Sequence, residues 1–390
     1  MSNPKLALIP SGYKSGKVYS ILPNDATGDF DFDRASEGTR VRKGGLIEEV
    51  TNDVPRLDWY DSNCPSLLLE PQRTNGFTYS EQFNQSVWFK SSCTITTNQI
   101  IAPDGTLTAD LATSTASGGG VYRFNSWDTT EKTASIFVKK NTSSTTEIFN
   151  ASSPTNRVVY DLGNGIIDTE GGSMTGTIED FGNDWYRLTA THTATASQSF
   201  GIKPETSKSV YIWGAQIEDA SYSSSYIKTE ASTVTRLKDE CLNGGDSDLF
   251  NITEGSWFLD LVPYEITAPS KEITLSDGTN NNRFLLQFQT TNTTVRLLVV
   301  SGGSTGVSLF EPITINTRNK ILVTFKENEF KIYINGTLEG TDTSGNVPTG
   351  LDTFNFSNVN DINNFEGKVY DTRVYDRVLT EAEAIQLTTL

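Results

Sequence analysis

The sequence predicts an all-β chain in which a strand-rich leader is followed by two β-sandwiches and one short helix at the C-terminal end. Of the 390 residues, 36% are hydrophobic and 20% charged, with 31 glycines, a profile that favours strands and turns over helices. Apolar and polar residues alternate in many short runs, as in strands with one buried face. Turn sequences separate these runs at roughly ten-residue spacing, which is typical of β-sandwiches. A chain of this length is expected to form about two to three domains.

Residues 1–75 are predicted to form the leader, which we expect to serve assembly. The run 29–33 alternates between aspartate and phenylalanine, which places Phe30 and Phe32 on one face of a strand. The leucine run 67–69 lies between two prolines and predicts a buried strand. Because copies of an acidic chain repel one another, a stable oligomer needs an apolar interface, and we expect these two apolar surfaces to supply it.

Residues 76–228 are predicted to form the first sandwich, a jelly roll. Its strands are expected at the alternating runs 133–139, 185–194 and 210–217. The sequence Gly163-Asn164-Gly165 between two apolar runs predicts a hairpin.

A linker, 229–250, is predicted to precede the second sandwich at 251–390. Within the second sandwich, alternating runs on both sides of Asn335-Gly336 predict a three-stranded meander over 321–338. Thr380 and Glu383 have the spacing of a capping box and predict a helix of about two turns, which we expect to close the open end of the sandwich.

Charge and targeting signals exclude several classes of partner. The net charge of −17 disfavours binding to nucleic acid and to anionic membranes. The sequence has no apolar stretch long enough for membrane insertion and no secretory signal at its start. The three cysteines allow one disulfide bond at most, and we expect Cys64 and Cys241 to lie near each other.

Catalytic motifs are missing from the sequence, so we do not expect an enzyme. His192 is the only histidine, and its place in an alternating run favours a structural role. The second sandwich has no acidic triplet of the kind that sandwich-fold glucanases carry on one strand. No phosphate-binding loop precedes a helix, and no organic cofactor is expected.

Asp29, Asp31 and Asp33 are the only candidate metal ligands. At normal strand rise they lie about 6.6 Å apart along one face. A solvated or salt-bridged edge is the first interpretation, a Ca²⁺ site the second and a catalytic pair the third.

Aromatic residues supply the candidate ligand site. Trp127 follows a flexible glycine-rich segment in polar surroundings, and Tyr122 and Trp88 are further candidates. Aromatic rings on loops or sheet faces can stack on the apolar faces of sugars. The alternative for each tryptophan is an ordinary place in a sandwich core, and we expect this for Trp185, Trp213 and Trp257.

Three groups of segments resemble a known family. The leader segments 33–41, 45–58 and 64–75 resemble the leader of phage virion proteins that act as tail or head fibres. The segments 185–187, 211–218 and 225–227 look like the carbohydrate-binding-module-like jelly roll of those proteins. The last part, including 374–381, is similar to concanavalin A-like, laminin-G-type sandwiches.

The resemblance implies a place on the outer surface of a virion and binding to host-surface glycans for adsorption. It also implies contacts with other virion proteins and a homo-oligomer, usually a trimer, but no catalytic residues. The lack of an export signal fits a virion that leaves its host by lysis. A purely structural capsid or head decoration is the alternative function, and a virion-associated polysaccharide depolymerase is a third. We expect any glycan to be neutral or cationic and to bind weakly at each site.

Overall fold

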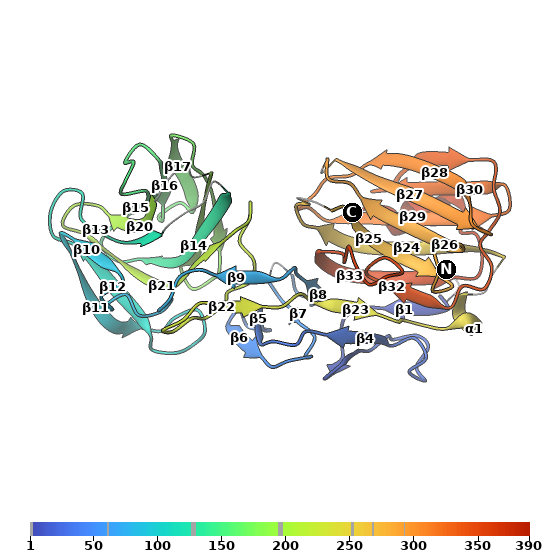
Figure 1. Ribbon diagram of the computed structural model, residues 1–390, viewed down its shortest axis with the longest axis horizontal. Coiled ribbons are helices and arrows are strands. Elements are labelled where there is room, and N and C mark those ends of the chain that lie inside the picture. Colours follow the sequence, from blue (N-terminus) through green and yellow to red (C-terminus); the bar gives the residue numbers. More distant parts are fainter. Residues whose placement is uncertain are drawn as a thin grey trace. The chain divides into compact units, whose positions relative to one another are not determined.

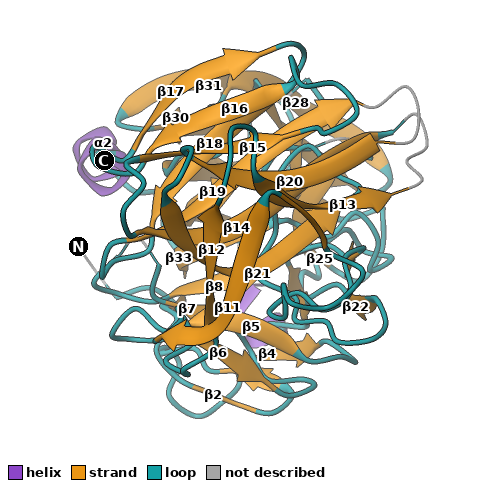
Figure 2. Ribbon diagram, turned by 90° about the vertical axis from the view of Figure 1, so that its left-hand side faces the viewer, coloured by secondary structure: helices purple, strands orange, loops and turns teal. Residues whose placement is uncertain are grey.

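The structure is a computed structural model that describes residues 3–60, 62–125, 130–193, 198–250, 253–266, 269–291 and 293–390. Strands dominate it, which confirms the predicted all-β fold (Figure 2). The described residues contain two helices, α1 (Ser247–Phe250) and α2 (Glu381–Thr388). Because a membrane-spanning helix needs about 20 residues, neither helix could cross a bilayer.

The chain divides into two compact units (Figure 1). The C-terminal unit consists of Met1–Glu37, Val50–Pro71 and Leu237–Leu390, and the middle unit of Gly38–Glu49 and Gln72–Arg236. The predicted leader is therefore shared between both units. Its hairpin of β5 (Gly38–Val41) and β6 (Ile47–Val50) lies almost wholly in the middle unit, and most of its other strands belong to the C-terminal unit.

The middle unit is a sandwich of two six-stranded antiparallel sheets. The first sheet has the strand order β10 (Phe89–Ser91), β13 (Gly120–Asn125), β20 (Gln198–Pro204), β15 (Thr145–Phe149), β16 (Arg157–Asp161) and β17 (Ile166–Gly171). The second has the order β11 (Cys93–Ile100), β12 (Ala109–Ser114), β21 (Ser209–Glu218), β14 (Glu131–Lys140), β19 (Trp185–Thr193) and β18 (Thr175–Asp180). Three predicted strands appear as β14, β19 and β21, and β16 and β17 form the predicted hairpin. A short pair, β9 (Arg73–Asn75) with β22 (Val234–Arg236), joins the two ends of the unit's main segment.

The 211–218 segment, which carries part of the family resemblance, has a structural role. The Gln216 amide donates a hydrogen bond to the Glu218 carboxylate at 2.7 Å and accepts one from the backbone of Ile227 at 2.6 Å. The backbone N–H of Ser224 donates to the same carboxylate at 2.9 Å. These side chains are buried, and their bonds attach the segment after β21 to the strand itself.

The C-terminal unit is a second sandwich. One sheet has the order β31 (Thr337–Asp342), β30 (Glu329–Ile334), β29 (Asn319–Lys326), β24 (Glu254–Pro263), β33 (Gly367–Tyr375), β8 (Ser66–Leu69) and β7 (Leu57–Asp58), with β1 (Leu6–Leu8) also paired to β33. The other has the order β28 (Ser304–Pro312), β27 (Thr294–Ser301), β26 (Arg283–Phe288), β25 (Lys271–Ser276) and β32 (Thr353–Asn355). The strands β29, β30 and β31 form the predicted meander.

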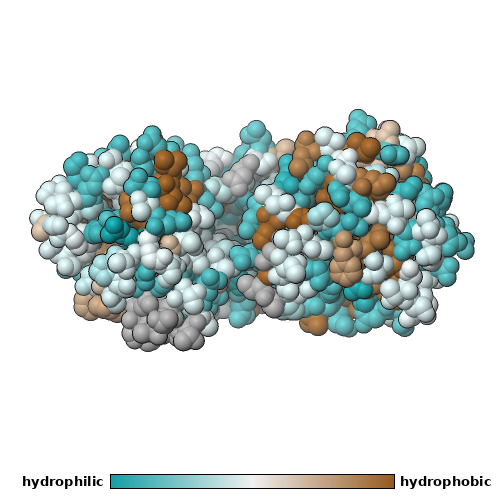
Figure 3. All heavy atoms as spheres, turned by 90° about the horizontal axis from the view of Figure 1, so that it is seen from above, coloured by the Kyte–Doolittle hydropathy of each residue, from teal (hydrophilic) through white to brown (hydrophobic). Residues whose placement is uncertain are grey.

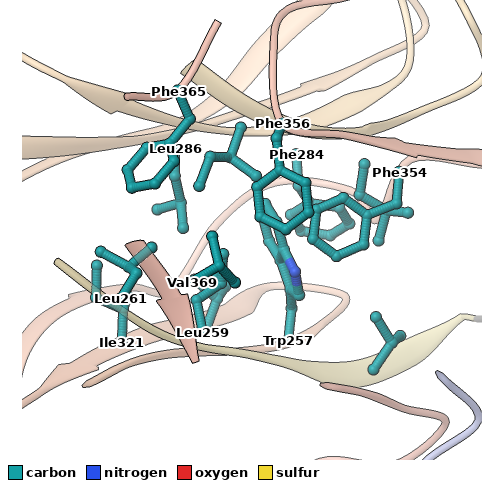
Figure 4. Packing of buried hydrophobic residues seen from close by; sticks show 14 of the residues in the cluster. Trp257, Leu259, Leu261, Phe284, Leu286, Ile321, Phe354, Phe356, Phe365 and Val369 are labelled. Atoms are coloured by element: carbon teal, nitrogen blue, oxygen red, sulfur yellow. The ribbon is translucent and has the colours of Figure 1, made fainter. Parts of the chain in front are cut away.

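Alternate residues of each sheet build the core of this sandwich. Trp257, Leu259 and Leu261 of β24 point toward Phe284 and Leu286 of β26 (Figure 4). All five side chains are fully buried. The period-two pattern in the sequence therefore marks the inward face of both sheets.

Leader residues complete this core. Leu67, Leu68 and Leu69 of β8 are buried beside β33, as predicted for the strand. Phe30 lies on Phe354 and Phe356, with ring centroids 5.3 and 5.6 Å away. These are the residues that were expected to form an oligomer interface. That expectation is corrected, because their apolar surfaces are already covered within one chain.

A four-stranded sheet, β2 (Tyr13–Lys14), β3 (Lys17–Val18), β4 (Phe30–Asp33) and β23 (Glu240–Leu242), joins the leader to the segment after residue 237. Beside it, four charged side chains are buried together. Arg34 contacts the Asp239 carboxylate at 3.1 Å, and Arg56 contacts both Glu70, at 2.5 Å, and Asp239. Two cations and two anions balance one another, and the neighbouring carboxylates raise the pKa of Arg56 against the effect of its burial. We call these four residues the buried ion network.

The helix α2 begins with the predicted capping box. The Thr380 hydroxyl accepts from the backbone of Glu383, whose carboxylate accepts from the backbone of Thr380. We expected this helix to close the open end of the sandwich, but it does not. Its Ala384 packs with Phe258 and Leu322 instead, on the outer face of the sheet that contains β24 and β29.

The three cysteines are free, so no bond joins Cys64 to Cys241. Cys64 is exposed, whereas Cys241 is buried in the core of the C-terminal unit. Cys93 is buried in the middle unit, and burial raises the pKa of its thiol to about 11.

Candidate functional site

The outer face of the six-stranded sheet that begins with β10 carries aromatic rings in mutual contact. Phe89 of β10 and Tyr122 of β13 stack with ring centroids 5.9 Å apart and planes 16° from parallel. Phe124 of β13 meets both rings edge-on, with centroids 5.1 Å from Phe89 and 5.4 Å from Tyr122. Phe89 is 49% exposed and Phe124 50%. We call Phe89, Tyr122 and Phe124 the aromatic patch.

Strand pairing explains why these rings meet. Phe89 and Tyr122 are directly opposite each other on β10 and β13. Phe124 lies two residues beyond Tyr122 and so projects from the same face of the sheet. Val121, which precedes Tyr122, points the other way and is buried in the core of the middle unit.

A glycine on the next strand makes room for the rings. Gly201 of β20 is opposite Tyr122 on one side and opposite Phe149 of β15 on the other. A Cβ atom added at Gly201 would lie 2.3 Å from the Cβ of Tyr122 and 2.6 Å from the carbonyl oxygen of Val121. Because Gly201 has no side chain, Tyr122 and Phe149 meet edge-on across it, with ring centroids 6.1 Å apart.

Charged residues lie at the β15 side of the patch. Lys203 of β20 forms an ion pair with Glu147 at 2.6 Å, and its ammonium lies 5.5 Å from the ring centroid of Phe149. Arg157 of β16 is opposite Phe149 and is exposed. Hydrogen-bonding groups therefore flank an apolar surface, an arrangement that can both stack on a ligand and orient it.

Glu205 supports the strand that carries Phe149. Its carboxylate accepts hydrogen bonds from the backbone N–H groups of Ser144, at 2.9 Å, and Thr145, at 2.8 Å, and from both hydroxyls. These bonds, led by the one from the Thr145 backbone, lower the pKa of Glu205 to about 2. At neutral pH the ionised carboxylate holds the beginning of β15 in place.

The three predicted aromatic candidates have different outcomes. Tyr122 belongs to the aromatic patch. Trp127 lies outside the described residues. Trp88 is only 3% exposed, and its indole N–H donates to the carbonyl of Tyr79 at 3.1 Å. We correct the expectation for Trp88, because a ring buried in the core offers no face to a sugar.

Sequence reasoning missed Phe89 and Phe124. For Phe124 a signal existed, because Tyr122-Arg123-Phe124 has two aromatic residues at strand spacing. For Phe89 none existed, since its position depends on the pairing of β10 with β13.

The candidate metal ligands do not converge. Asp29 accepts a hydrogen bond from the backbone of Ser20 at 2.9 Å, Asp31 pairs with Lys17 at 2.6 Å, and Asp33 is exposed. Across the described ranges, no three histidine, cysteine or acidic side chains are grouped so that they could hold a metal ion. The contacts of Asp31 fit a salt-bridged edge, and the geometry gives no support to the Ca²⁺ interpretation.

His192 is buried, and its two ring nitrogens lie 3.1 Å from the Ser173 hydroxyl and 3.4 Å from the Asn156 amide. Its burial and its two hydrogen-bond partners are typical of a structural residue. Three tryptophans expected in the cores are buried as well: Trp185, Trp213 and Trp257.

One pair of carboxylates is relevant to the alternative hypothesis that the chain is a polysaccharide depolymerase. Asp260 and Asp371 are opposite each other on β24 and β33. Arg318 binds Asp260 with two hydrogen bonds of 2.7 and 2.8 Å, and Arg373 binds Asp371 with two of 3.1 and 2.6 Å. Burial raises the pKa of Asp371, but the paired guanidinium opposes this effect. Two-carboxylate glycosidases need one acid that gives up a proton to the substrate, whereas each of these carboxylates is held by two hydrogen bonds from its own arginine. This pair is best explained as a structural ion-pair network.

Comparison with known proteins identifies the second sandwich. Residues 264–385 match the family model of the concanavalin A-like lectin/glucanases superfamily. This part of the chain is a concanavalin A-like domain. The match covers less than half of the chain. Among curated proteins, no sequence matches this chain.

Several solved structures resemble part of the chain. The CBM40 domain of the Ruminococcus gnavus IT-sialidase, bound to α2,3-sialyllactose, is 17% identical with a TM-score of 0.32, over 38% of this chain and 93% of its own. Domain 4 of the arabinanase AbnA from Geobacillus stearothermophilus, in complex with arabinotriose, is 18% identical with a TM-score of 0.32. The match covers 44% of this chain and 84% of that domain's chain. The Caenorhabditis elegans galectin LEC-6 is 15% identical with a TM-score of 0.25, and the match covers 32% of this chain and 84% of the galectin chain.

Proposed function

We propose that this chain is a phage virion protein, a fibre or surface appendage that binds host-surface glycans through the aromatic patch. The observation that carries the proposal is the exposure of Phe89 and Phe124 in contact with Tyr122 on an open sheet face. Aromatic rings bind apolar surfaces that also carry polar groups at their edges. Sugar rings have this character, with C–H faces and hydroxyl edges.

A purely structural explanation accounts for only part of the patch. A large ring beside a strand glycine can stabilise a sheet by covering the space that the glycine leaves. This explains the contact between Tyr122 and Phe149 across Gly201. It does not require two further phenylalanines, Phe89 and Phe124, to stay half exposed beside them.

The proposed place on a virion rests on the leader. Its segments resemble those of phage fibre proteins, and the buried ion network draws Arg34, Arg56 and Glu70 from them. The concanavalin A-like domain agrees with the laminin-G-type end of the same resemblance. Several copies in a homotrimer, and many on one particle, would raise the avidity of a weak site, because later contacts become intramolecular. Other virion proteins would anchor the chain.

A glycan array tests the proposal. We expect the intact chain to retain neutral or cationic glycans of a bacterial surface, and Phe124→Ala and Trp127→Ala to reduce the signal. Ile166→Ala is the matched control, since Ile166 is 53% exposed on the same sheet but at its opposite edge. Retention of no glycan would favour the structural decoration instead, and release of shorter sugars would favour a depolymerase.

A further inference from the structure

We propose that Asp110 makes the aromatic patch sensitive to pH, because it controls how firmly the strand that carries Phe89 is attached to the rest of the middle unit. The attachment is firm in mildly acidic solution and weaker at neutral pH and above. This inference adds regulation to the site of the proposed function, and it rests on that function for the role of Phe89.

Asp110 of β12 is a buried side chain that joins two other segments. It is only 1% exposed. One carboxylate oxygen accepts a hydrogen bond from the backbone N–H of Phe83 at 3.1 Å, and the other accepts one from the backbone N–H of Asn98, also at 3.1 Å. Asn98 has a backbone φ of 56° and lies where the pairing of β11 with β12 is irregular. The carboxyl group therefore holds both an irregular strand and the turn before β10.

The turn before β10 is firmly joined to the aromatic patch. The ring of Phe83 packs on the ring of Trp88 with centroids 5.0 Å apart, and both side chains are buried. Phe89, the next residue, belongs to the patch. On its other side, the Lys90 ammonium donates to the backbone carbonyl of Gln85 at 2.7 Å. We therefore expect the turn and β10 to move together.

β10 depends on this turn because its own pairing is limited. The strand has three residues, lies at the edge of its sheet and pairs there with β13. Short edge segments with few contacts of their own open more easily than central strands. Asp110 belongs to the other sheet of the sandwich, so its hydrogen bond to Phe83 ties the two sheets together at this edge.

The charge of Asp110 has only neutral partners. Within the described part of the chain, no lysine or arginine forms an ion pair with it, and its donors are two backbone N–H groups. Burial raises the pKa of Asp110 to about 6, and the hydrogen bonds from Asn98 and Phe83 oppose this effect only in part.

The charges of neighbouring titratable groups do not contribute to this raised pKa. The elements that pack around Asp110 carry these groups: Cys93 on β11, Tyr211 and Glu218 on β21, Tyr122 and Arg123 on β13, Lys203 on β20, Asp104 in the loop before β12, and Tyr79, Glu81 and Lys90 around the turn.

The direction of the pH dependence follows from the raised pKa. The ordinary pKa of an aspartate is 3.8, so Asp110 binds a proton more readily when it is buried than when it is in water. Protonation therefore favours the attached state. A protonated carboxyl also keeps an acceptor oxygen for the backbone donors. As the pH rises through 6, the group ionises, and the cost of burying its charge favours detachment of the turn.

Hydrogen exchange of the intact chain at pH 5 and pH 7 tests the proposal. Protection factors, taken relative to unstructured peptides at the same pH, remove the pH dependence of the exchange reaction itself. We expect peptides that cover 83–91 to be about tenfold better protected at pH 5 than at pH 7. Peptides from β16 and β17, at the opposite edge of the same sheet, should change less than twofold. Glu205, with a pKa of about 2, stays ionised at both pH values.

Two variants identify the group responsible. Asp110→Asn carries no charge and keeps an acceptor oxygen, so 83–91 should be equally protected at both pH values. Asp161→Asn is the matched control, because Asp161 accepts backbone hydrogen bonds from Gly163 at 2.8 Å and Asn164 at 3.1 Å in an exposed turn. This variant should keep the tenfold difference. If Asp110→Asn does not fold, carbon-13 NMR of the wild-type Asp110 carboxyl replaces it, with an expected midpoint of about 6.

Three results would overturn the proposal. The first is equal protection of 83–91 at the two pH values in the wild type. The second is a change of the same size in β16 and β17, which would indicate opening of the whole unit. The third is a pH dependence that persists in Asp110→Asn, or a carboxyl midpoint near the ordinary 3.8. Failure to bind any glycan would refute the proposed function alone, because exchange is measured on the free chain.

Discussion

The Arg56 guanidinium forms a buried ion pair with the Asp239 carboxylate, across 183 residues of sequence. Asp239 also contacts Arg34 and accepts a hydrogen bond from the backbone of Glu70 at 2.8 Å. Removing charges from water costs free energy, and this cost is offset only when each charge meets an opposite one. The pair therefore ties the leader to the segment that precedes the concanavalin A-like domain.

Asp239→Asn should destabilise the C-terminal unit by about 3 to 5 kcal/mol, because two buried guanidinium groups would then share one carboxylate. Hydrogen exchange of peptides that cover residues 30–33 and 66–69 measures this loss of stability. Asp376→Asn is the control, since Asp376 pairs with Lys5 at 3.7 Å and both side chains are well exposed. It should cost less than about 1 kcal/mol. Equal exchange rates in both variants would contradict the role of the buried ion network.

Gly201→Ala should disturb the aromatic patch. The added methyl group would lie too close to Tyr122 and to the backbone of β13, so either the ring or the strand must shift. We expect a loss of about 1 to 3 kcal/mol in the stability of the middle unit. Gly163→Ala, where the neighbours are the ends of flexible side chains, is the control. Chemical denaturation measures both variants, and an unchanged midpoint for Gly201→Ala would argue against the close packing.

The stability of the middle unit should depend on pH through Glu205. Hydrogen bonds lower the pKa of this carboxyl to about 2, below its ordinary value of 4.5. A lowered pKa in the folded state stabilises the protein above pH 4.5, and this contribution is lost as the pH falls toward 2. The wild type should therefore melt at a higher temperature than Glu205→Gln at pH 7, with a smaller difference at pH 3. A difference that is the same at both pH values would refute this.

The expected homotrimer should appear as a species of three times 42.8 kDa in light scattering of the intact chain at micromolar concentration. Leu67, Leu68 and Leu69 cannot provide its interface, because they are buried within one chain. Other surfaces must therefore join the copies. A monomer as the only species would count against a fibre.

The sequence predicted the fold well where the signal is local. Alternation located Phe30 and Phe32 on a buried face, and the spacing of Thr380 and Glu383 located the capping box. Such patterns depend on strand pleat and on helix-end hydrogen bonds, which neighbouring residues determine.

Contacts between residues far apart along the chain could not be predicted from the sequence. Nothing near Arg56 indicates that Asp239 will meet it, and nothing near Phe89 indicates that β10 will pair with β13. The error for Trp88 has the same origin, since the residues next to a tryptophan in the sequence do not reveal whether the fold buries its ring. On the surface, hydrophobic residues form separate patches among hydrophilic ones (Figure 3), so composition alone does not single out one of them.

Calorimetric titration with a glycan that the array identifies tests the central claim most directly. We expect the wild type to bind it with a dissociation constant of about 0.1 to 1 mM per site, with little change between low and moderate salt. The double variant Phe89→Ala/Phe124→Ala should bind at least tenfold more weakly, and Ile166→Ala should bind like the wild type. Undiminished binding by the double variant would contradict the account.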